Sequence, residues 1–330
     1  MLGRSVFDPL SPQAHAISNL FIFTSIIALA IIVLIVAVLT YTTIRFRQRP
    51  GQGDPRQTFG LSWLEIIWTV IPVLIVTIVF GATISTMKDS SPGQLSPGRR
   101  PIALTVIGHQ WWWEGRYSSG VVTANEIHVP VGRRLVVALK SPDDDVIHSL
   151  WVPQCGPKMD AVPGQTNYVW LECDRAGVYD GDCAEFCGAG HAWMLVRVIA
   201  EPASTFDAWQ RHQRRPAPTL KQLRPARPFS VGDVATGQRL FRHYTCQSCH
   251  VITGGATHTP PGPTSVRVGP NLTHMGSRQI IAAGRISNTV ANMERWLANP
   301  HELKPGVHMP NFQLSGPEVR ALTAYLESLQ

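Results

Sequence analysis

The sequence predicts a multidomain protein made of a two-helix transmembrane hairpin, an all-β domain and an all-α domain. Three observations support this. Two long apolar runs lie near the N-terminus, short strand-like segments separated by turn residues follow, and the last part opens with a helical pattern that ends at C-x-x-C-H. The 330 residues suffice for two or three domains. We expect the hairpin and a linker at 1–100, the β domain at 101–202, a connecting segment at 203–230 and the α domain at 231–330.

The N-terminal part has the features of a membrane hairpin. The apolar run at residues 17–44 is far longer than the apolar region of a signal peptide, which has roughly 7–15 residues. Arginines follow, and positive residues stay in the cytoplasm, so we expect the N-terminus outside. A second apolar run at 61–87 contains Pro72, which a membrane bundle tolerates, and returns the chain across the bilayer. Both termini are therefore expected to be extracytoplasmic, in the periplasm of a Gram-negative cell. The loop arginines are Arg45, Arg47, Arg49 and Arg56.

The basic balance of the chain does not indicate nucleic-acid binding. Lysine and arginine number 29 against 22 aspartates and glutamates. Much of the excess lies beside the membrane spans and in residues 211–228, which hold four prolines and six basic residues. We expect this stretch to be a stiff linker that follows an amphipathic segment around Phe206 and Trp209. The expected partner is the lipid bilayer.

Glu65 is the only charged residue in the second apolar run. It lies about four residues from the start of the run and so roughly 6 Å deep. A carboxylate within a membrane is a candidate functional group. The alternative is an interfacial side chain that reaches back to water.

Turn residues divide the middle of the chain into short strand-like segments, which predicts an antiparallel β-barrel or sandwich of the cupredoxin kind. The cysteine-rich stretch 183–194 falls between two of the last strands. Trp111, Trp112 and Trp113 are consecutive, and successive side chains of a strand point to opposite faces, so we expect at least one to be exposed. The predicted strands are 102–107, 111–117, 135–139, 147–152, 166–171 and 195–199.

Residues 183–194 read C-A-E-F-C-G-A-G-H-A-W-M and form the densest group of metal donors. Thiolate, thioether and imidazole donors together favour copper. His148, in an apolar run 35 residues before Cys183, supplies a second imidazole. Two cysteines at this spacing can bridge two metal ions, with one histidine on each side and the methionine as a weak axial ligand. A disulfide or a zinc site is the alternative, but neither uses this methionine. The candidate ligands are His148, Cys183, Cys187, His191 and Met194.

A second cofactor motif lies at Cys246, Cys249 and His250. C-x-x-C-H is the attachment sequence of c-type haem, in which two thioethers hold the porphyrin and the histidine takes one axial position. A zinc or redox motif would need partners that are absent. The sixth iron ligand should be a methionine or a histidine. The candidates that follow the motif are Met275, Met293, His308 and Met309.

Two cysteines remain when these motifs are set aside. Cys155 and Cys173 form an even pair in the part of the chain that is expected outside the cytoplasm. We therefore expect them to form a disulfide, which requires an oxidising compartment.

The metal motif resembles the CuA site of cytochrome c oxidase subunit II, and the resemblance covers nearly all of residues 10–200. It implies a dinuclear copper centre bridged by Cys183 and Cys187. It further implies that Glu185 is a ligand through its backbone carbonyl, and that its side chain reaches a magnesium ion shared with subunit I. The implied terminal ligands are His148, His191 and Met194.

The same resemblance gives roles to two other residues. Glu65 lies in L-E-I-I-W-T-V-I-P and matches the glutamate at the mouth of a proton channel whose body is in subunit I. Trp111 lies in G-H-Q-W-W-W-E and matches the surface residue that receives electrons from cytochrome c.

The C-terminal part resembles small class I cytochromes c. The loop K-P-G-V-H-M-P-N-F is similar to their methionine loop and implies Met309 as the sixth ligand, with His308 as the second choice. Pro270, in V-G-P-N-L, matches the proline whose carbonyl orients the axial histidine.

Together the parts resemble subunit II of a caa-type haem–copper oxidase in a bacterial inner membrane. This implies that a donor reduces haem c, which passes electrons to the copper pair and on to the haems of subunit I, where oxygen is reduced and protons are translocated. The implied partners are subunits I and III. The implied donor is cytochrome c or quinol:cytochrome c oxidoreductase.

Two other functions fit part of the pattern. A membrane-tethered copper chaperone also uses C-x3-C and a distant histidine, but it must release its metal and needs no haem. A CuA-bearing denitrification reductase similar to nitrous oxide reductase would carry a further large copper domain, for which 330 residues leave no room.

Overall fold

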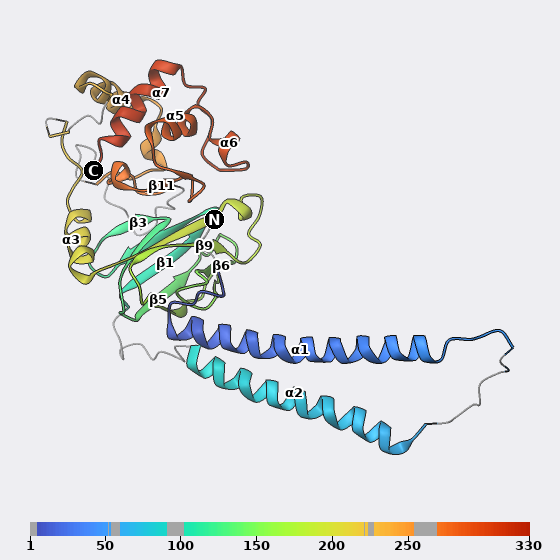
Figure 1. The fold of residues 1–330 in the computed structure, drawn as a ribbon. Helices are drawn as coiled ribbons and strands as arrows, with labels where there is room; N and C mark the ends of the chain where they lie inside the picture. The colour runs from blue at the N-terminus through green and yellow to red at the C-terminus, as the bar shows by residue number, and fades with distance from the viewer. Residues whose placement is uncertain are drawn as a thin grey trace. The chain divides into compact units, whose positions relative to one another are not determined.

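The computed structural model describes residues 5–51, 53, 60–90, 102–220, 222–223, 228–253 and 269–330. The chain forms two compact units. One is Pro12–Ser91, and the other combines Met1–Ser11 with Pro92–Gln330. Figure 1 shows long helices in the first unit and, in the second, a β domain and a helical domain. The predicted fold class, two apolar helices followed by an all-β and an all-α domain, is confirmed.

The first unit consists of α1 (Pro12–Arg45) and α2 (Ser62–Ser90). They hold 34 and 29 residues, and a membrane span needs about 20. The side chains in the most apolar part of each helix are not buried by other parts of the protein. These side chains can therefore contact lipid. Pro72 lies inside α2, and Arg56 of the predicted basic loop lies outside the described residues.

The β domain, called the sandwich domain below, spans residues 102–201 and contains two five-stranded sheets. Their strand orders are β3-β2-β1-β5-β8 and β4-β10-β9-β6-β7. Most neighbours are antiparallel, but β1 pairs with β5 and β4 with β10 in parallel, which differs from the expected antiparallel arrangement. The strands are β1 (Leu104–His109), β2 (Trp112–Tyr117), β3 (Val122–Ala124), β4 (Glu126–Pro130), β5 (Leu135–Lys140), β6 (His148–Trp151), β7 (Met159–Ala161), β8 (Asn167–Leu171), β9 (Gly177–Cys183) and β10 (Leu195–Glu201).

Four of these strands were not expected from the sequence: β3, β4, β7 and β9. Strand β9 reads G-V-Y-D-G-D-C, in which glycines and aspartates weaken the strand pattern. Its buried positions nevertheless alternate, at Tyr179, Gly181 and Cys183. A side chain at Gly181 would collide with the carbonyl oxygen of Trp151, so the strand needs glycine there.

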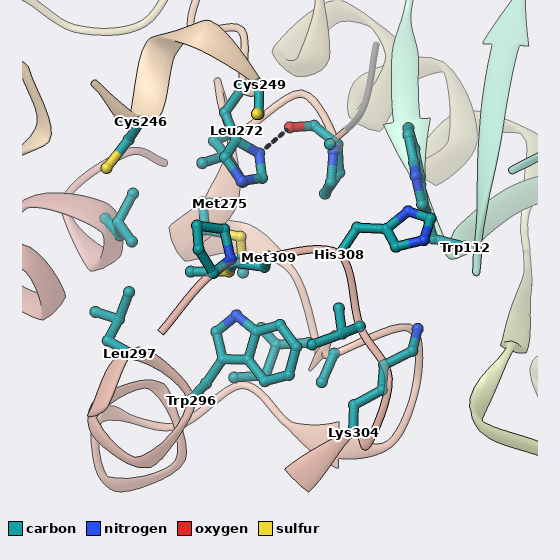
Figure 2. A pocket seen from close by; sticks show the side chains of 18 of the residues that line it. Trp112, Cys246, Cys249, Leu272, Met275, Trp296, Leu297, Lys304, His308 and Met309 are labelled. Atoms are coloured by element: carbon teal, nitrogen blue, oxygen red, sulfur yellow. Dashed lines mark hydrogen bonds between the residues drawn. The ribbon is translucent and has the colours of Figure 1, made fainter. Parts of the chain in front are cut away.

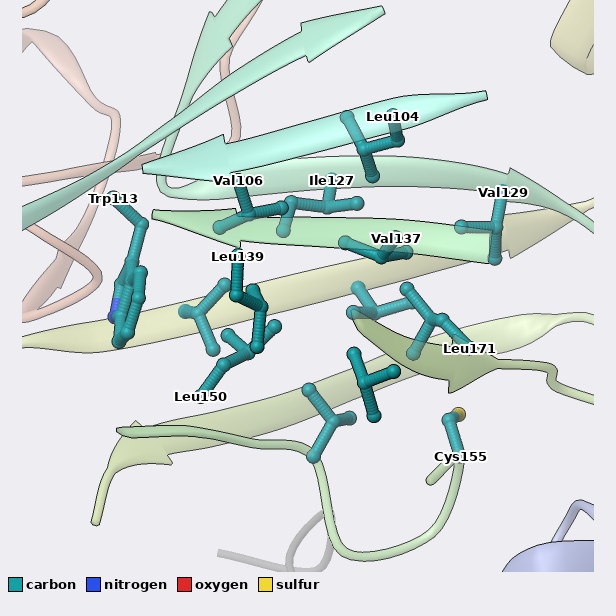
Figure 3. Close-up of a cluster of buried hydrophobic side chains, with 14 of the residues drawn as sticks. Leu104, Val106, Trp113, Ile127, Val129, Val137, Leu139, Leu150, Cys155 and Leu171 are labelled. Carbon is teal, nitrogen blue, oxygen red and sulfur yellow. The ribbon is translucent and has the colours of Figure 1, made fainter. Parts of the chain in front are cut away.

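The core of the sandwich domain lies between the two sheets. Large side chains from both of them fill it, as Figure 3 shows, and Trp113 is fully buried. Burying each large aliphatic side chain is worth about 1.5–3 kcal/mol relative to exposure. The other central members include Leu104, Val106, Ile127, Val137, Leu139 and Leu150.

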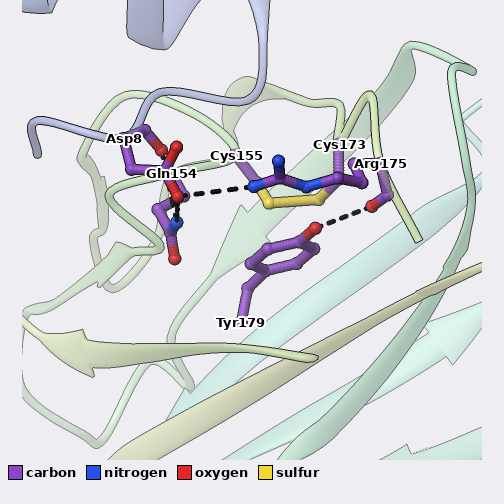
Figure 4. The surroundings of a disulfide bond; sticks show 6 residues. All are labelled: Asp8, Gln154, Cys155, Cys173, Arg175 and Tyr179. Atoms are coloured by element: carbon purple, nitrogen blue, oxygen red, sulfur yellow. Dashed lines mark hydrogen bonds and ion pairs between the residues drawn. A yellow bond between two sulfur atoms is a disulfide. The ribbon is translucent and has the colours of Figure 1, made fainter. Parts of the chain in front are cut away.

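Cys155 and Cys173 form a disulfide with a sequence separation of 18 residues (Figure 4). Closing a loop of this length contributes about 3 kcal/mol in the chain-entropy model. Beside it, the side chain of Gln154 donates a hydrogen bond to the Asp8 carboxylate at 3.0 Å, and Arg175 lies 3.4 Å from the same carboxylate. The segment before α1 is thus fixed to the sandwich domain.

Helix α3 (Ala203–Gln213) covers part of the sandwich domain with its apolar face. The Trp209 ring stacks on His128 at 4.0 Å and meets Tyr117 edge-on at 5.3 Å. The next residues are not a free linker where they are described: Ala217 is buried and donates its amide to the Thr253 carbonyl at 2.7 Å. Lys221, Arg224 and Arg227 of the expected linker lie outside the described residues.

The all-α domain, called the helical domain below, comprises the described residues from 228 to 330. Helix α4 (Val231–His243) begins at Ser230, whose side chain forms a capping box with Asp233. It packs closely on α7 (Gly316–Glu327), because Gly237 faces the Ala321 carbonyl where a Cβ atom would collide. The other elements are η2 (Cys246–Ser248), η3 (Met275–Ser277), β11 (Ile280–Ile281), β12 (Ile286–Ser287), α5 (Val290–Ala298) and α6 (Pro300–Leu303).

Candidate functional site

The cysteine-rich loop joins β9 to β10 at one end of the second sheet. Cys183 is the last residue of β9 and His148 is the first residue of β6. The Cys183 amide donates to the Met194 carbonyl at 3.0 Å, and the Ala184 amide donates to the Ser149 carbonyl at 2.8 Å. These bonds close the loop and hold it over β6, which brings His148 to the two thiols.

The two thiols and two imidazoles lie in one group. The Sγ atoms of Cys183 and Cys187 are 3.8 Å apart. His148 Nδ1 lies 4.0 Å from Cys183 Sγ, and His191 Nδ1 lies 3.6 Å from Cys187 Sγ. Each imidazole therefore stands beside a different thiol, which is the arrangement expected of a bridged metal pair.

Met194 and Glu185 complete the group. Met194 is fully buried, with Sδ 3.9 Å from Cys187 Sγ. The carbonyl oxygen of Glu185 accepts a hydrogen bond from Cys183 Sγ at 3.3 Å, while the Glu185 side chain is exposed. This donor set of two sulfur types and two imidazoles fits copper. Within the pair of thiols, their mutual hydrogen bond lowers the pKa of the Cys183 thiol and raises the pKa of the Cys187 thiol. Cys183 is therefore the thiol that more readily becomes the metal-binding thiolate, and a metal ion would displace the proton that Cys187 keeps.

Three residues that the sequence analysis did not identify hold His148 in place. Its Nε2 lies 3.4 Å from Asp145 Oδ1, and the other oxygen of Asp145 accepts the Gln110 amide at 3.1 Å. Gly108 makes room for the ring, because a Cβ atom there would lie 2.8 Å from His148 Cδ2. Carboxylate partners of this kind orient ligating histidines. The run of three aspartates ahead of His148 was the available sequence signal.

The expectation that at least one of the three consecutive tryptophans is exposed is wrong. Trp111, Trp112 and Trp113 are 8%, 6% and 0% exposed. Trp113 enters the sandwich core, as a strand residue should. The other two are covered by the helical domain: the Trp111 ring lies 4.8 Å from that of His308, and Trp112 packs with Ala283.

Trp111 also contacts the cysteine loop directly. Its indole Nε1 donates a hydrogen bond to the Cys187 carbonyl oxygen at 2.8 Å, and Gln110 Nε2 donates to the same oxygen at 2.8 Å. A side chain at Gly190 would collide with the Trp111 ring. The indole is therefore held between the cysteine loop on one side and His308 on the other.

A cavity of about 340 Å³ contains the haem-attachment motif (Figure 2). His250 Nδ1 donates a hydrogen bond to the Pro270 carbonyl oxygen at 2.8 Å, which leaves Nε2 as the free ring nitrogen. Gly269 allows this approach, because a Cβ atom there would lie 2.6 Å from His250 Cε1. Two cysteines, a neutral oriented histidine and an apolar cavity fit a covalently attached haem. The cavity is lined by all five predicted residues: Cys246, Cys249, His250, Pro270 and Met309.

The loop after α6 supplies the candidate for the sixth ligand. Met309 and His308 both line the cavity, and Figure 2 shows the His308 ring on the side where Trp112 of the sandwich domain lies. Met275 and Met293 also line the cavity but belong to the buried core of the helical domain. All three methionines line the cavity, and the role of Met309 as the ligand remains a prediction.

The cavity is not closed by the helical domain alone. Gln110, Trp111, Trp112 and Asn125 of the sandwich domain also line it. Lys304 is buried beside them and donates a hydrogen bond from Nζ to the Trp111 carbonyl oxygen. Trp111 therefore contacts the cysteine loop and also lines the cavity that contains the haem-attachment motif.

Glu65 belongs to the first unit. It lies in the first turn of α2 with an exposed side chain, and its carbonyl oxygen accepts a hydrogen bond from Thr69 Oγ1 at 2.8 Å. Its role in proton uptake remains a prediction.

Models of three known families match the chain. "Cytochrome C oxidase subunit II, transmembrane domain" matches residues 3–85, "Cytochrome C oxidase subunit II, periplasmic domain" matches residues 115–201, and "Cytochrome c" matches residues 234–330. Their order along the chain is that of the two apolar helices, the sandwich domain and the helical domain.

Two relatives with the same name match nearly the whole of this chain. Cytochrome c oxidase subunit 2 of Alkalihalophilus pseudofirmus is 33% identical over 99% of this chain and 91% of the relative. The protein of the same name from Bacillus subtilis is 30% identical over 99% of this chain and 93% of the relative. Among solved structures, the periplasmic domain of subunit II of cytochrome oxidase from Bradyrhizobium japonicum is 26% identical, with a TM-score of 0.33, over 36% of this chain and 97% of that domain.

We predict different effects for the bridging and the axial ligands. Cys183→Ser or Cys187→Ser should abolish the EPR signal of a delocalised copper pair, because one thiolate cannot bridge and hold both ions. Met194→Leu, the matched control, should keep both coppers and change only the reduction potential, because a weak axial ligand tunes the site. Metal analysis of the full chain measures the copper content of each variant, and its EPR spectrum shows whether the copper pair is delocalised. A delocalised signal in either serine variant would contradict the bridging assignment.

Proposed function

The chain belongs to the cytochrome c oxidase subunit II family and carries a C-terminal cytochrome c domain, and from this premise we propose that it is the subunit through which electrons enter a terminal respiratory oxidase. Electrons from a donor would arrive at the helical domain, pass to the cysteine loop of the sandwich domain and continue to subunit I, where oxygen is reduced. When bound, haem c and a copper pair supply the one-electron carriers.

The observation that carries this proposal is the run of contacts between the two candidate centres. Met309 faces the cavity, and the preceding residue, His308, places its ring 4.8 Å from the ring of Trp111. Trp111 in turn donates its indole N–H to the Cys187 carbonyl at 2.8 Å. Two centres that served separate partners would not need such a connection.

The chain's own residues prepare both centres for electron transfer with little rearrangement. The Pro270 carbonyl fixes the His250 ring, and Asp145 fixes the His148 ring. Burial of Cys183 and Cys187 keeps water away from the two thiols. Rigid, dry sites of this kind change little in structure when one electron is added or removed.

Trp111 has a different position from that of a surface residue. Because it is 8% exposed and lies against His308, a separate donor protein does not reach its ring. We assign Trp111 to the transfer of electrons between the two domains. Donors such as cytochrome c or quinol:cytochrome c oxidoreductase would then deliver electrons to the helical domain.

The remaining assignments follow from the family. We propose subunits I and III as partners, a bacterial inner membrane as the location, and both termini on the extracytoplasmic side. A disulfide between Cys155 and Cys173 agrees with an oxidising compartment. The exposed side chain of Glu185 is available to a magnesium ion shared with subunit I.

Cofactor counting tests the proposal. The full chain purified from membranes should hold one covalently attached haem and two coppers, measured by haem staining after denaturation and by metal analysis. The double variant Cys246→Ser and Cys249→Ser should lose the covalent haem and keep both coppers, because the two centres have separate ligands. A single copper per chain, or a wild-type chain free of covalent haem, would refute the assignment.

Glu65 is proposed to take part in proton delivery to subunit I. Glu65→Gln should slow oxygen consumption by the assembled oxidase about tenfold or more, because an amide does not carry protons. Haem and copper content should stay as in the wild type. Normal turnover in this variant would identify Glu65 as an ordinary interfacial residue.

A further inference from the structure

Glu126 begins β4 of the sandwich domain, but its carboxylate binds the helical domain. Its Oε1 atom accepts hydrogen bonds from the backbone amides of Gln279 and Ile280, both at 2.7 Å. Glu126 is only 3% exposed. Burying a carboxylate costs free energy unless it is hydrogen-bonded and paired with positive charge. The two amides of the helical domain supply these hydrogen bonds, so separating the domains would leave the Glu126 carboxylate without them.

The positive charge comes from Arg278, next to the bound amides. Glu126 and Arg278 together line a small pocket of about 90 Å³ between the domains. Burial raises the pKa of Glu126, and the charge of Arg278 together with the two amide hydrogen bonds opposes this effect. Burial likewise lowers the pKa of Arg278 to about 10, and the charge of Glu126 opposes this effect. Arg278 also lines the haem cavity and donates a hydrogen bond to the Asn271 carbonyl. The carboxylate thus meets a part of the helical domain that is already fixed to the cavity wall.

Other described contacts across the same interface include hydrogen bonds to backbone carbonyls and a contact between a cation and an aromatic ring. The Leu195 amide donates to the Ala283 carbonyl at 3.1 Å, and the Arg285 guanidinium lies 4.3 Å from the centre of the Trp193 ring. Lys304 donates to a neutral backbone carbonyl of the sandwich domain. Glu126 differs from these contacts because its carboxylate accepts two amide hydrogen bonds and also lies near the positive charge of Arg278.

We propose that Glu126 is a positioning residue that holds the helical domain on the sandwich domain in the orientation in which His308 meets Trp111. It acts through the β11 segment and touches neither candidate centre. As a consequence of this docking, the helical domain covers Trp111, and separate donor proteins do not reach its ring. The docking role stands by itself, and only its effect on electron transfer rests on the proposed function.

Amide hydrogen exchange in the full, cofactor-loaded chain tests the docking role. Glu126→Met keeps the side-chain volume but removes the acceptor and the charge, so the peptide that contains Gln279 and Ile280 should exchange at least tenfold faster. Glu126→Gln keeps an acceptor oxygen and loses the charge opposite Arg278, so its exchange should rise by a smaller factor. The matched control is Glu172→Gln. Glu172 pairs with Arg134 within the sandwich domain at 2.7 Å and should leave the peptide unchanged.

Haem absorbance and copper EPR identify which variants are folded and loaded. Wild-type exchange of this peptide in any loaded Glu126 variant overturns the proposal, as does an equal increase in the Glu172 control. In the same samples, haem-to-copper electron transfer after flash reduction should slow at least tenfold in Glu126→Met. If the wild type shows no such transfer while the exchange rates change as expected, the proposed function fails and the docking role of Glu126 stands.

Discussion

The indole nitrogen of Trp111 donates a hydrogen bond to the carbonyl oxygen of Cys187, and this contact joins the cysteine loop to the surface on which the helical domain lies. Gln110 donates to the same oxygen, and Lys304 donates to the carbonyl of Trp111 itself. The position of one thiol is therefore coupled to the wall of the haem cavity. Any displacement of the Trp111 ring would disturb both candidate centres, which explains why it is enclosed on both sides.

The helical domain contributes the matching surface from segments that lie far apart in the sequence. The loop after α6 carries both Met309, in the cavity, and His308, against Trp111. The β11 segment supplies the amides that bind Glu126. The core of the helical domain is built around the close crossing of α4 and α7. This packed core fixes the position of the β11 segment relative to the loop after α6. Domain docking and cofactor position thus depend on the same elements.

Local motifs predicted much of the site, whereas the individual residues that form the contacts between the domains were not predicted. The spacing of ligands around Cys183 and the haem motif at Cys246 are short-range features, because one loop or one turn presents them. Strand β9 was missed because its sequence is rich in glycine and aspartate, and only its neighbours make it a strand. The expected exposure of at least one of the three consecutive tryptophans was wrong, because the residues that cover Trp111 and Trp112 lie in another domain. Glu126 resembles any strand carboxylate until the fold brings β11 to it.

The proposed transfer of electrons between the two domains of one chain is tested most directly by its dependence on protein concentration. The haem of the full chain in detergent is reduced by a flash, and the copper band is followed over a hundredfold range of protein concentration. We expect first-order transfer with one rate constant throughout and only a mild effect of salt, because the domains are already in contact. A rate proportional to protein concentration would show that electrons move between molecules, and transfer within one chain would then be refuted.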